Sequence, residues 1–279
     1  ATVYLPLWHY EFEDLVVLKN NKGTEETRVR HMDYTFQLNK LMYERLLSGG
    51  NITFFDPNDV PGLYESFFVD QDKFKEIYET YERKTSIRKK TLPALDVFQT
   101  LLAERKDTGR VYIMNVDHAN DHGSFDSKLA PIRMSNLCCE IDLPTKPLKS
   151  YDDPNGEISL CTLSAINWGL INDPSEFEKY CTLSVRALDE LLDYQDYPIE
   201  AAYVSTMNRR PLGIGIINLA YFLAKRGLTY DQNAFKTVDL YAEAWSYYLI
   251  KASADLAKEK GKINKNNETK YASGILPID

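Results

Sequence analysis

The stretch from Leu95 to Met114 reads LDVFQTLLAERKDTGRVYIM. Leu95, Phe98 and Leu102 recur at spacings of three and four residues, which is typical of an amphipathic helix, and Gly109 is placed to end it. The apolar, β-prone residues that follow predict a short strand. A helix that leads into a strand is a building unit of α/β folds.

The same order occurs upstream and downstream. The upstream helix stops at Gly49-Gly50, before strand-like residues 52–55. A downstream helix begins at Asp173-Pro174-Ser175-Glu176, where the residue types match a capping box with proline in the first turn. The apolar stripe of that helix is Phe177, Cys181, Val185, Leu188 and Leu192.

Further helices are predicted over residues 212–226 and 234–260. The alternation favours an α/β architecture with largely parallel strands and covering helices. No interdomain linker is visible, so residues 1–279 are interpreted as one domain. Residues 144–156, which are rich in Pro and Asp, are expected to form a surface loop.

Composition narrows the possible functions. The chain has 279 residues, 41 acidic against 33 basic, and a net charge of −8, which argues against nucleic acid as a partner. It contains no apolar run long enough for a membrane span and no signal-peptide pattern, and its four cysteines do not resemble a secreted disulfide framework. A cytoplasmic protein with reduced or redox-active thiols is expected.

The ends of the sequence predict a piece of something longer. The chain opens on Ala1-Thr2-Val3-Tyr4-Leu5, already strand-like, without a Met start, and it stops directly after an apolar run. It is either part of a larger protein or one half of a protein encoded in two parts.

The run Ser135-Asn136-Leu137-Cys138-Cys139-Glu140-Ile141 carries the chemistry. In a strand over about residues 131–142, Asn136, Cys138 and Glu140 would share one face at steps of about 7 Å, with the apolar alternate residues behind them. A hydrogen-bonding amide, a sulfur and a proton acceptor on one face could bind a small polar substrate such as a sugar and react with it. A second strand, about residues 158–165, carries Cys161 and could face the first.

The other cysteines and the histidines have structural interpretations. Cys139 and Cys181 lie on apolar faces by period and are expected in the core. His118 and His122 are four residues apart, but the Asn-, Asp- and Gly-rich segment around them predicts a polar loop near the site and no metal site.

Two further motifs also have structural interpretations. Gly213-Ile214-Gly215 lacks the third glycine of a dinucleotide fingerprint and the lysine of a P-loop, so it is expected to mark close helix packing. Tyr247-Tyr248 suggests a radical relay, but Tyr248 belongs to an apolar helical stripe and is interpreted as core.

The chain resembles the large catalytic subunits of class I ribonucleoside-diphosphate reductases of the aerobic bacterial and phage type, over essentially its whole length. The motifs that carry the resemblance are Tyr4 to His9, Val17 to Asn21, Arg28 to Tyr34, Asp59 to Tyr64, Asn115 to His118, Ser135 to Ile141, Leu191 to Pro198, Arg210 to Gly215 and Gly274 to Asp279.

The resemblance implies part of a ten-stranded α/β barrel, incomplete at both ends. It implies that Cys138 becomes a thiyl radical that removes the 3′ hydrogen of the ribose, that Glu140 takes the 3′-hydroxyl proton, and that Asn136 hydrogen-bonds the reacting groups. Cys161 would be one of two reducing thiols that form a disulfide. The segment 136–140, including Leu137 and Cys139, would contact the substrate.

The resemblance also implies partners and places their cofactors elsewhere. The activity would be reduction of ribonucleoside diphosphates for DNA synthesis, in an allosteric, ATP-regulated homodimer of large subunits in the cytoplasm, or in the host cytoplasm for a phage protein. A small subunit would supply the radical from its own metal cofactor, and thioredoxin or glutaredoxin would supply reducing equivalents. No metal or cofactor is expected on this chain itself.

The chain departs from the family pattern in several places. Cys139 stands where a residue other than cysteine is expected, and the second reducing cysteine belongs to the region before Ala1. The effector-binding region, the specificity loop, the phosphate-binding segment, the relay tyrosines and the C-terminal cysteines are also absent. Two alternatives therefore stay open: an adenosylcobalamin-dependent reductase, and a non-catalytic half of a split enzyme that acts by association.

Overall fold

The computed structural model describes residues 1–275 and divides them into two compact units. Unit 1 consists of Ala1–Thr145 and the described residues from Glu268 onward, and unit 2 consists of Lys146–Asn267. Each unit has its own hydrophobic core. Residues 276–279, which belong to the last family motif named above, lie outside the described residues.

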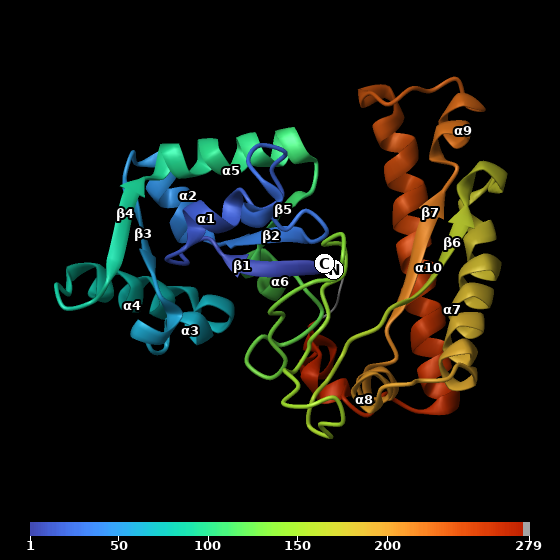
Figure 1. The fold of residues 1–279 in the computed structure, drawn as a ribbon. Coiled ribbons are helices and arrows are strands. Elements are labelled where there is room, and N and C mark those ends of the chain that lie inside the picture. The colour runs from blue at the N-terminus through green and yellow to red at the C-terminus, as the bar shows by residue number, and fades with distance from the viewer. Residues whose placement is uncertain (276–279) are drawn as a thin grey trace. The chain divides into compact units, whose positions relative to one another are not determined.

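Unit 1 is built on a sheet of three parallel strands in the order β1-β2-β5 (Figure 1). The strands span Thr2–Pro6 (β1), Asp33–Leu38 (β2) and Val111–Asn115 (β5). Every residue of the central strand β2 is buried, as expected when helices cover a parallel sheet. The predicted parallel pairing is confirmed here.

Helices and a small second sheet surround these strands. Helix α5 (Ala94–Thr108) runs along one side of the sheet (Figure 1) and ends at Gly109 in the left-handed conformation, as predicted. Strands β3 (Asn51–Phe55) and β4 (Lys89–Pro93) pair antiparallel. The other helices of unit 1 are α1 (Phe12–Val16), α2 (Lys40–Leu47), α3 (Leu63–Val69), α4 (Gln71–Arg83) and α6 (Val116–Asp121).

Aromatic side chains fill the core of unit 1. Trp8 lies edge-on to Phe67 with ring centroids 5.8 Å apart, and Phe74 packs on both. All three are completely buried. Burial of side chains of this size is worth about 2 to 3 kcal/mol each, so this cluster stabilises the platform on which the sheet rests.

Unit 2 is built on two parallel strands, β6 (Thr162–Asn167) and β7 (Leu212–Ile217). Helices α7 (Phe177–Tyr194) and α10 (Phe235–Lys260) pack against each other, and α7 packs on the strands (Figure 1). Helices α8 (Glu200–Arg209) and α9 (Leu219–Ala224) flank β7 in the sequence. Short 3-10 helices of the chain cover Glu25–Thr27, Pro57–Asp59, Trp168–Leu170, Pro174–Glu176, Gln232–Ala234, Asn266–Glu268 and Lys270–Ser273.

Trp168 is the centre of the core of unit 2. Its ring lies 5.5 Å from those of Phe177 and Phe222, and Tyr241 of α10 packs at 4.8 Å from Phe222. Arg226 stacks over Phe222 at 3.8 Å and donates a hydrogen bond to the Tyr241 hydroxyl. The helices are therefore joined through one aromatic cluster.

The predictions for α7 and α10 are confirmed. Asp173 and Glu176 form the predicted capping box, and the whole predicted stripe of α7 is buried. Helix α10 ends at Lys260, before Gly261. Tyr248 packs against the core while Tyr247 is half exposed, which agrees with the structural interpretation of this pair.

The helix predicted over residues 212–226 is wrong in its first half. Residues 212–217 form strand β7, and only residues 219–224 are helical. The reason is pairing with a strand distant in sequence: β7 is hydrogen-bonded to β6 with Leu163 opposite Gly213, and this non-local contact overrides a local apolar spacing. Gly213-Ile214-Gly215 therefore lies in a strand and does not mark helix packing.

The segment 116–121, predicted to be a polar loop, is helix α6. Its polar side chains form hydrogen bonds with residues outside the helix: Asp117 accepts the backbone N–H of Lys40 at 2.7 Å, and Asn120 is hydrogen-bonded to Ile132. These tertiary contacts offset the poor helix propensity of Asn and Asp. The loop prediction for residues 144–156 is confirmed.

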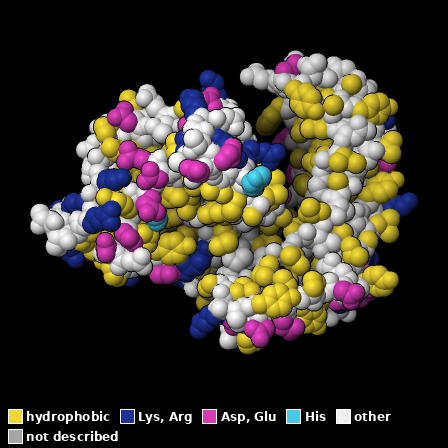
Figure 2. Space-filling view, in the orientation of Figure 1, with side chains coloured by type: hydrophobic (Ala, Val, Ile, Leu, Met, Phe, Trp, Pro, Cys, Tyr) yellow, Lys and Arg dark blue, Asp and Glu magenta, His cyan; other side chains and the backbone are white. Residues whose placement is uncertain are grey.

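The surface carries many apolar side chains (Figure 2). In unit 2, Leu163 of β6 is 65% exposed and Leu170, just after β6, is 67% exposed.

Within residues 1–275, no helix combines the length and the apolar character that crossing a membrane requires.

Candidate active site

The segment that carries Asn136, Cys138 and Glu140 is docked on the sheet of unit 1. The buried Asn120 of α6 donates to the carbonyl of Ile132 at 3.0 Å and accepts the Ile132 N–H at 2.8 Å. Gln37 of β2, 1% exposed, donates to the carbonyl of Arg133 at 2.6 Å. Buried polar side chains of α6 and β2 thus fix the start of this segment, which we call the finger loop (residues 131–142).

The predicted strand over residues 131–142 is wrong: the finger loop contains a tight turn and no strand. The N–H of Cys139 donates to the carbonyl of Asn136 at 3.3 Å, and Cys139 has the left-handed φ of 64°. Below the turn, the Ser135 hydroxyl donates to the carbonyl of Ile141 and accepts its N–H, at 2.6 and 3.0 Å. The side chains of Ser135 and Asn136 thus satisfy the backbone locally, which favours a turn over a strand.

The turn brings the predicted amide and carboxylate together. The Asn136 Nδ2 atom lies 2.5 Å from Oε1 of Glu140, and Asn136 Oδ1 accepts the backbone N–H of Glu140 at 3.1 Å. Cys138 lies between them at the tip of the turn and is exposed. The three residues are therefore gathered by one turn, and not by a shared strand face.

The apolar backing predicted for the other face is wrong in part. Leu137 is 49% exposed, while Cys139 is half-buried against the core of unit 1. Leu137 is exposed because the turn removes the strict alternation of a strand. The core prediction for Cys181 is confirmed, since it is fully buried in unit 2.

Two side chains of β1 hold the backbone of the turn, and sequence reasoning did not identify them. The Tyr4 hydroxyl donates to the carbonyl of Asn136 at 2.5 Å, and Thr2 donates to that of Leu137 at 2.6 Å. Burial, reinforced by the nearby Cys139 thiol, raises the pKa of Tyr4 to about 12, so it stays a donor at neutral pH. A signal was present in the alternation of β1, where the hydroxyl residues Thr2 and Tyr4 stand two apart and therefore point to the same face.

Cys139 borders a cavity of about 340 Å³ beside the finger loop. His118, His122 and Asp142 also line it, and the two imidazole rings lie 5.5 Å apart. Burial raises the pKa of both the Cys139 thiol and the Asp142 carboxyl. Among residues 1–275, no group of three or more His, Cys, Asp or Glu side chains is arranged to hold a metal ion.

Cys161 is half-buried and directly precedes β6, so the predicted strand over residues 158–165 begins later than expected. The chain before it is fixed on α8: the N–H of Ile158 donates to the carbonyl of Ala201 at 3.1 Å. Glu157 pairs with the buried Arg209, and also with Lys146 at 2.6 Å. Burial of Glu157 is outweighed by these cations, which lower the pKa of its carboxyl.

The structure thus gathers Asn136, Cys138 and Glu140 in unit 1 and places Cys161 in unit 2. The approach of Cys161 to Cys138 stays a prediction. Taken alone, the finger loop presents an accessible thiol on the same turn as a carboxylate that is oriented by an amide, which suits hydrogen or proton transfer at a polar substrate.

Comparison with known proteins identifies the family of the chain. Residues 1–279 match the family model described as the ribonucleotide reductase barrel domain, and the chain belongs to that family. The parallel sheets β1-β2-β5 and β6-β7 do not close within residues 1–275, in agreement with the predicted incomplete α/β barrel.

Relatives match along the whole chain. It is 59% identical to the ribonucleoside-diphosphate reductase subunit alpha of Haemophilus influenzae and 58% identical to that of Buchnera aphidicola from Schizaphis graminum, over 280 residues in each case. It is also 58% identical to the ribonucleoside-diphosphate reductase 1 subunit alpha of Escherichia coli. The chain spans 37% of the length of each of these relatives.

Proposed function

We propose that the complete subunit containing this chain reduces ribonucleoside diphosphates to 2′-deoxyribonucleoside diphosphates by a thiyl-radical mechanism. The observation that carries this proposal is the Asn136–Glu140 hydrogen bond across the turn that presents Cys138. The names of the relatives, which match along the whole chain, support the same reaction.

Each member of the turn has a role in this proposal. The Cys138 radical removes the 3′ hydrogen of the ribose, and Glu140 accepts the proton of the 3′ hydroxyl. Asn136 donates a hydrogen bond to the reacting groups and keeps the carboxylate of Glu140 directed toward the same point. The segment 136–140, including Leu137 and Cys139, borders the bound substrate.

Cys161 is proposed as one of two thiols that provide the electrons. Two thiols together give up two electrons and two protons and form one S–S bond, while the C2′–OH bond of the substrate breaks, water leaves and C2′ gains a hydrogen. The second thiol is supplied by another part of the complete subunit. Thioredoxin or glutaredoxin then reduces the disulfide.

The proposal includes further partners and a location. A small subunit generates the radical with its own metal cofactor, and the large subunit acts as an allosteric, ATP-regulated homodimer. The enzyme would act in the cytoplasm, or in the host cytoplasm for a phage protein. We infer no metal bound by this chain.

The test is substitution of Cys138→Ser in the complete subunit, assayed with its small subunit, a thioredoxin system and a ribonucleoside diphosphate. Deoxynucleotide formation should be abolished, because the O–H bond of serine is too strong to give the radical that removes the 3′ hydrogen, while nucleotide binding should survive. Cys181→Ala, in the core of unit 2, is the matched control and should retain turnover. Retained turnover in Cys138→Ser would refute the assignment, and turnover that needs adenosylcobalamin instead of the small subunit would refute the proposed radical source.

A further inference from the structure

Gly213 of β7 lies directly beside the sulfur of Cys161. A Cβ atom built on Gly213 would lie 2.8 Å from Cys161 Sγ and 2.5 Å from Leu163 Cδ2. Both distances are too short for contacts between non-bonded carbon or sulfur atoms, so any residue other than glycine would displace a neighbour. The sulfur therefore occupies space that exists because position 213 has no side chain.

The backbone at Gly213 does not itself require glycine. Gly213 is not among the residues with positive φ, and it pairs in regular parallel register with Leu163 of β6. Alanine can adopt this strand conformation. The need for glycine at this position comes from the space that its neighbours occupy.

The two crowded neighbours differ in their ability to move. Leu163 is 65% exposed and its Cδ2 atom is the end of a flexible side chain, so it can turn into solvent. The Cys161 sulfur is one bond from its own Cβ, and it can move only by rotation to another χ1 rotamer. That rotation changes the direction in which the thiol points.

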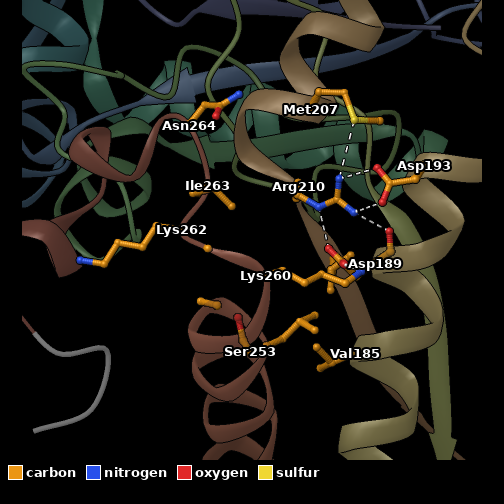
Figure 3. A pocket seen from close by; sticks show the side chains of 14 residues that line it. Val185, Asp189, Asp193, Met207, Arg210, Ser253, Lys260, Lys262, Ile263 and Asn264 are labelled. Atoms are coloured by element: carbon orange, nitrogen blue, oxygen red, sulfur yellow. Dashed lines mark hydrogen bonds and ion pairs between the residues drawn. The ribbon is translucent and has the colours of Figure 1, made fainter.

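Neither strand is easily shifted to relieve the crowding. Arg210, just before β7, has the left-handed φ of 44° and is bound by α7: its Nε donates to Asp189 at 2.6 Å, and its two Nη atoms bind Asp193 at 2.7 and 2.8 Å (Figure 3). Lys260 of α10 contacts Asp189 at 2.9 Å. The entry to β7 is thereby tied to both long helices.

The segment before Cys161 is fixed as well, through the Ile158–Ala201 hydrogen bond and the Glu157–Arg209 ion pair on α8. The segments that lead into β6 and β7 are therefore both fixed. A side chain at position 213 would be accommodated by movement of the Leu163 and Cys161 side chains, and not by sliding of the strands.

We propose that Gly213 is a positioning residue that sets the direction of the Cys161 thiol for disulfide formation. This inference rests on the proposed role of Cys161 as a reducing thiol. In that step Cys161 and the second thiol lose two electrons and two protons and form one S–S bond, while the substrate loses its 2′ hydroxyl as water.

The test compares Gly213→Ala with Gly215→Ala in the complete subunit. Gly215 lies two residues further along the same strand, and a Cβ there would meet only Ser164 O, at an ordinary 3.8 Å. The measurements are kcat and KM with the small subunit and substrate, and the rate at which iodoacetamide alkylates Cys161, followed by mass spectrometry. Urea unfolding verifies that both variants are folded.

Gly213→Ala should lower kcat on the order of 100-fold, because misplacement of a reacting group by about 1 Å costs that much. KM for the diphosphate should stay within twofold, since the substrate does not contact position 213 in this proposal, and the alkylation rate of Cys161 should change. Gly215→Ala should match the wild type in all three measurements.

The double variant Leu163→Ala/Gly213→Ala separates the two crowded contacts. It removes the Leu163 Cδ2 atom and leaves only the sulfur in conflict, so it should remain as slow as Gly213→Ala. Recovery of kcat in the double variant, or a Gly213→Ala variant with wild-type kcat and alkylation rate, would overturn the inference.

Failure of the proposed function is a separate result. If the wild-type holoenzyme forms no deoxynucleotide, the proposed reaction is wrong. The alkylation rates of the folded variants then still decide whether Gly213 directs the sulfur, and equal rates in Gly213→Ala and Gly215→Ala would overturn that geometry.

Discussion

Asn136 and Glu140 are joined twice across a single turn. The carboxamide nitrogen of Asn136 lies 2.5 Å from the Glu140 carboxylate, and its oxygen accepts the Glu140 N–H at 3.1 Å. One side chain therefore fixes the backbone of the turn and also orients the carboxylate. The amide and the acid of the site act as one structural unit, with Cys138 between them.

Asn136→Ala in the complete subunit should lower kcat by about 10- to 100-fold, because both contacts that orient Glu140 are lost. The measurement is steady-state formation of deoxynucleotide. Met134→Ala in the same loop, where the side chain is 41% exposed, is the control and should keep wild-type kcat. Equal rates in the two variants would mean that the Asn136–Glu140 unit has no part in turnover.

Tyr4→Phe should destabilise the finger loop by about 1 kcal/mol, the usual net value of a hydrogen bond. Amide exchange of residues 135–141, followed by mass spectrometry, should accelerate. Tyr112→Phe, on β5 of the same sheet, is the control and should leave this exchange unchanged.

The Tyr4 hydroxyl also gives the loop a defined pH dependence. Its pKa is raised to about 12 by burial, so the protonated form is favoured in the folded state. Its contribution is therefore complete below pH about 10 and is lost as the pH rises toward 12. Exchange that is insensitive to the Tyr4→Phe substitution at neutral pH would contradict this role.

Arg210→Ala should lower the free energy of unfolding by about 3 kcal/mol, the lower end of the range for a buried ion pair, because Lys260 still pairs with Asp189. Urea denaturation gives the value. Arg210 and the exposed Lys262 both border a cavity of about 350 Å³ (Figure 3), so Lys262→Ala is the control and should change the free energy of unfolding by less than about 0.5 kcal/mol.

The same cluster should make stability sensitive to acid. For Asp189, burial is outweighed by hydrogen bonds from Arg210 and Lys260, and for Asp193 the hydrogen bond from Arg210 is the main cause; both pKa values are lowered. Carboxyls with lowered pKa stabilise the fold above pH about 4 and lose this effect as the pH falls through their folded values. Arg210→Ala should therefore show a shallower loss of stability below pH 4, and an unchanged acid profile would contradict the pairing.

Local signals predicted α7 and α10 correctly because caps and apolar stripes act within one element. The strand β7 was predicted as helix because its conformation depends on β6, which is distant in sequence. The finger loop shows the same limit: the alternation of Asn136, Cys138 and Glu140 is compatible with a strand, but within residues 1–275 the loop pairs with no strand, and side-chain hydrogen bonds form a turn instead.

Asn136, Cys138 and Glu140 could be proposed as site residues from the sequence because they lie close together in it. The groups that hold them could not, because Tyr4, Gln37 and Asn120 reach the finger loop from β1, β2 and α6. A buried polar residue in a central strand, such as Gln37, is costly unless it has a partner, and this is the signal by which such supports could be identified.

The pairing of β6 with β7 has a consequence for the order in which unit 2 assembles. All of α7 and α8 lie between the two strands in the sequence, so pairing of the strands closes a long loop, and this costs less entropy once the helices have formed. The two helices are expected to form early and the strand contact late. The space beside Gly213 that holds the Cys161 sulfur would then be among the last features of the unit to be completed during folding.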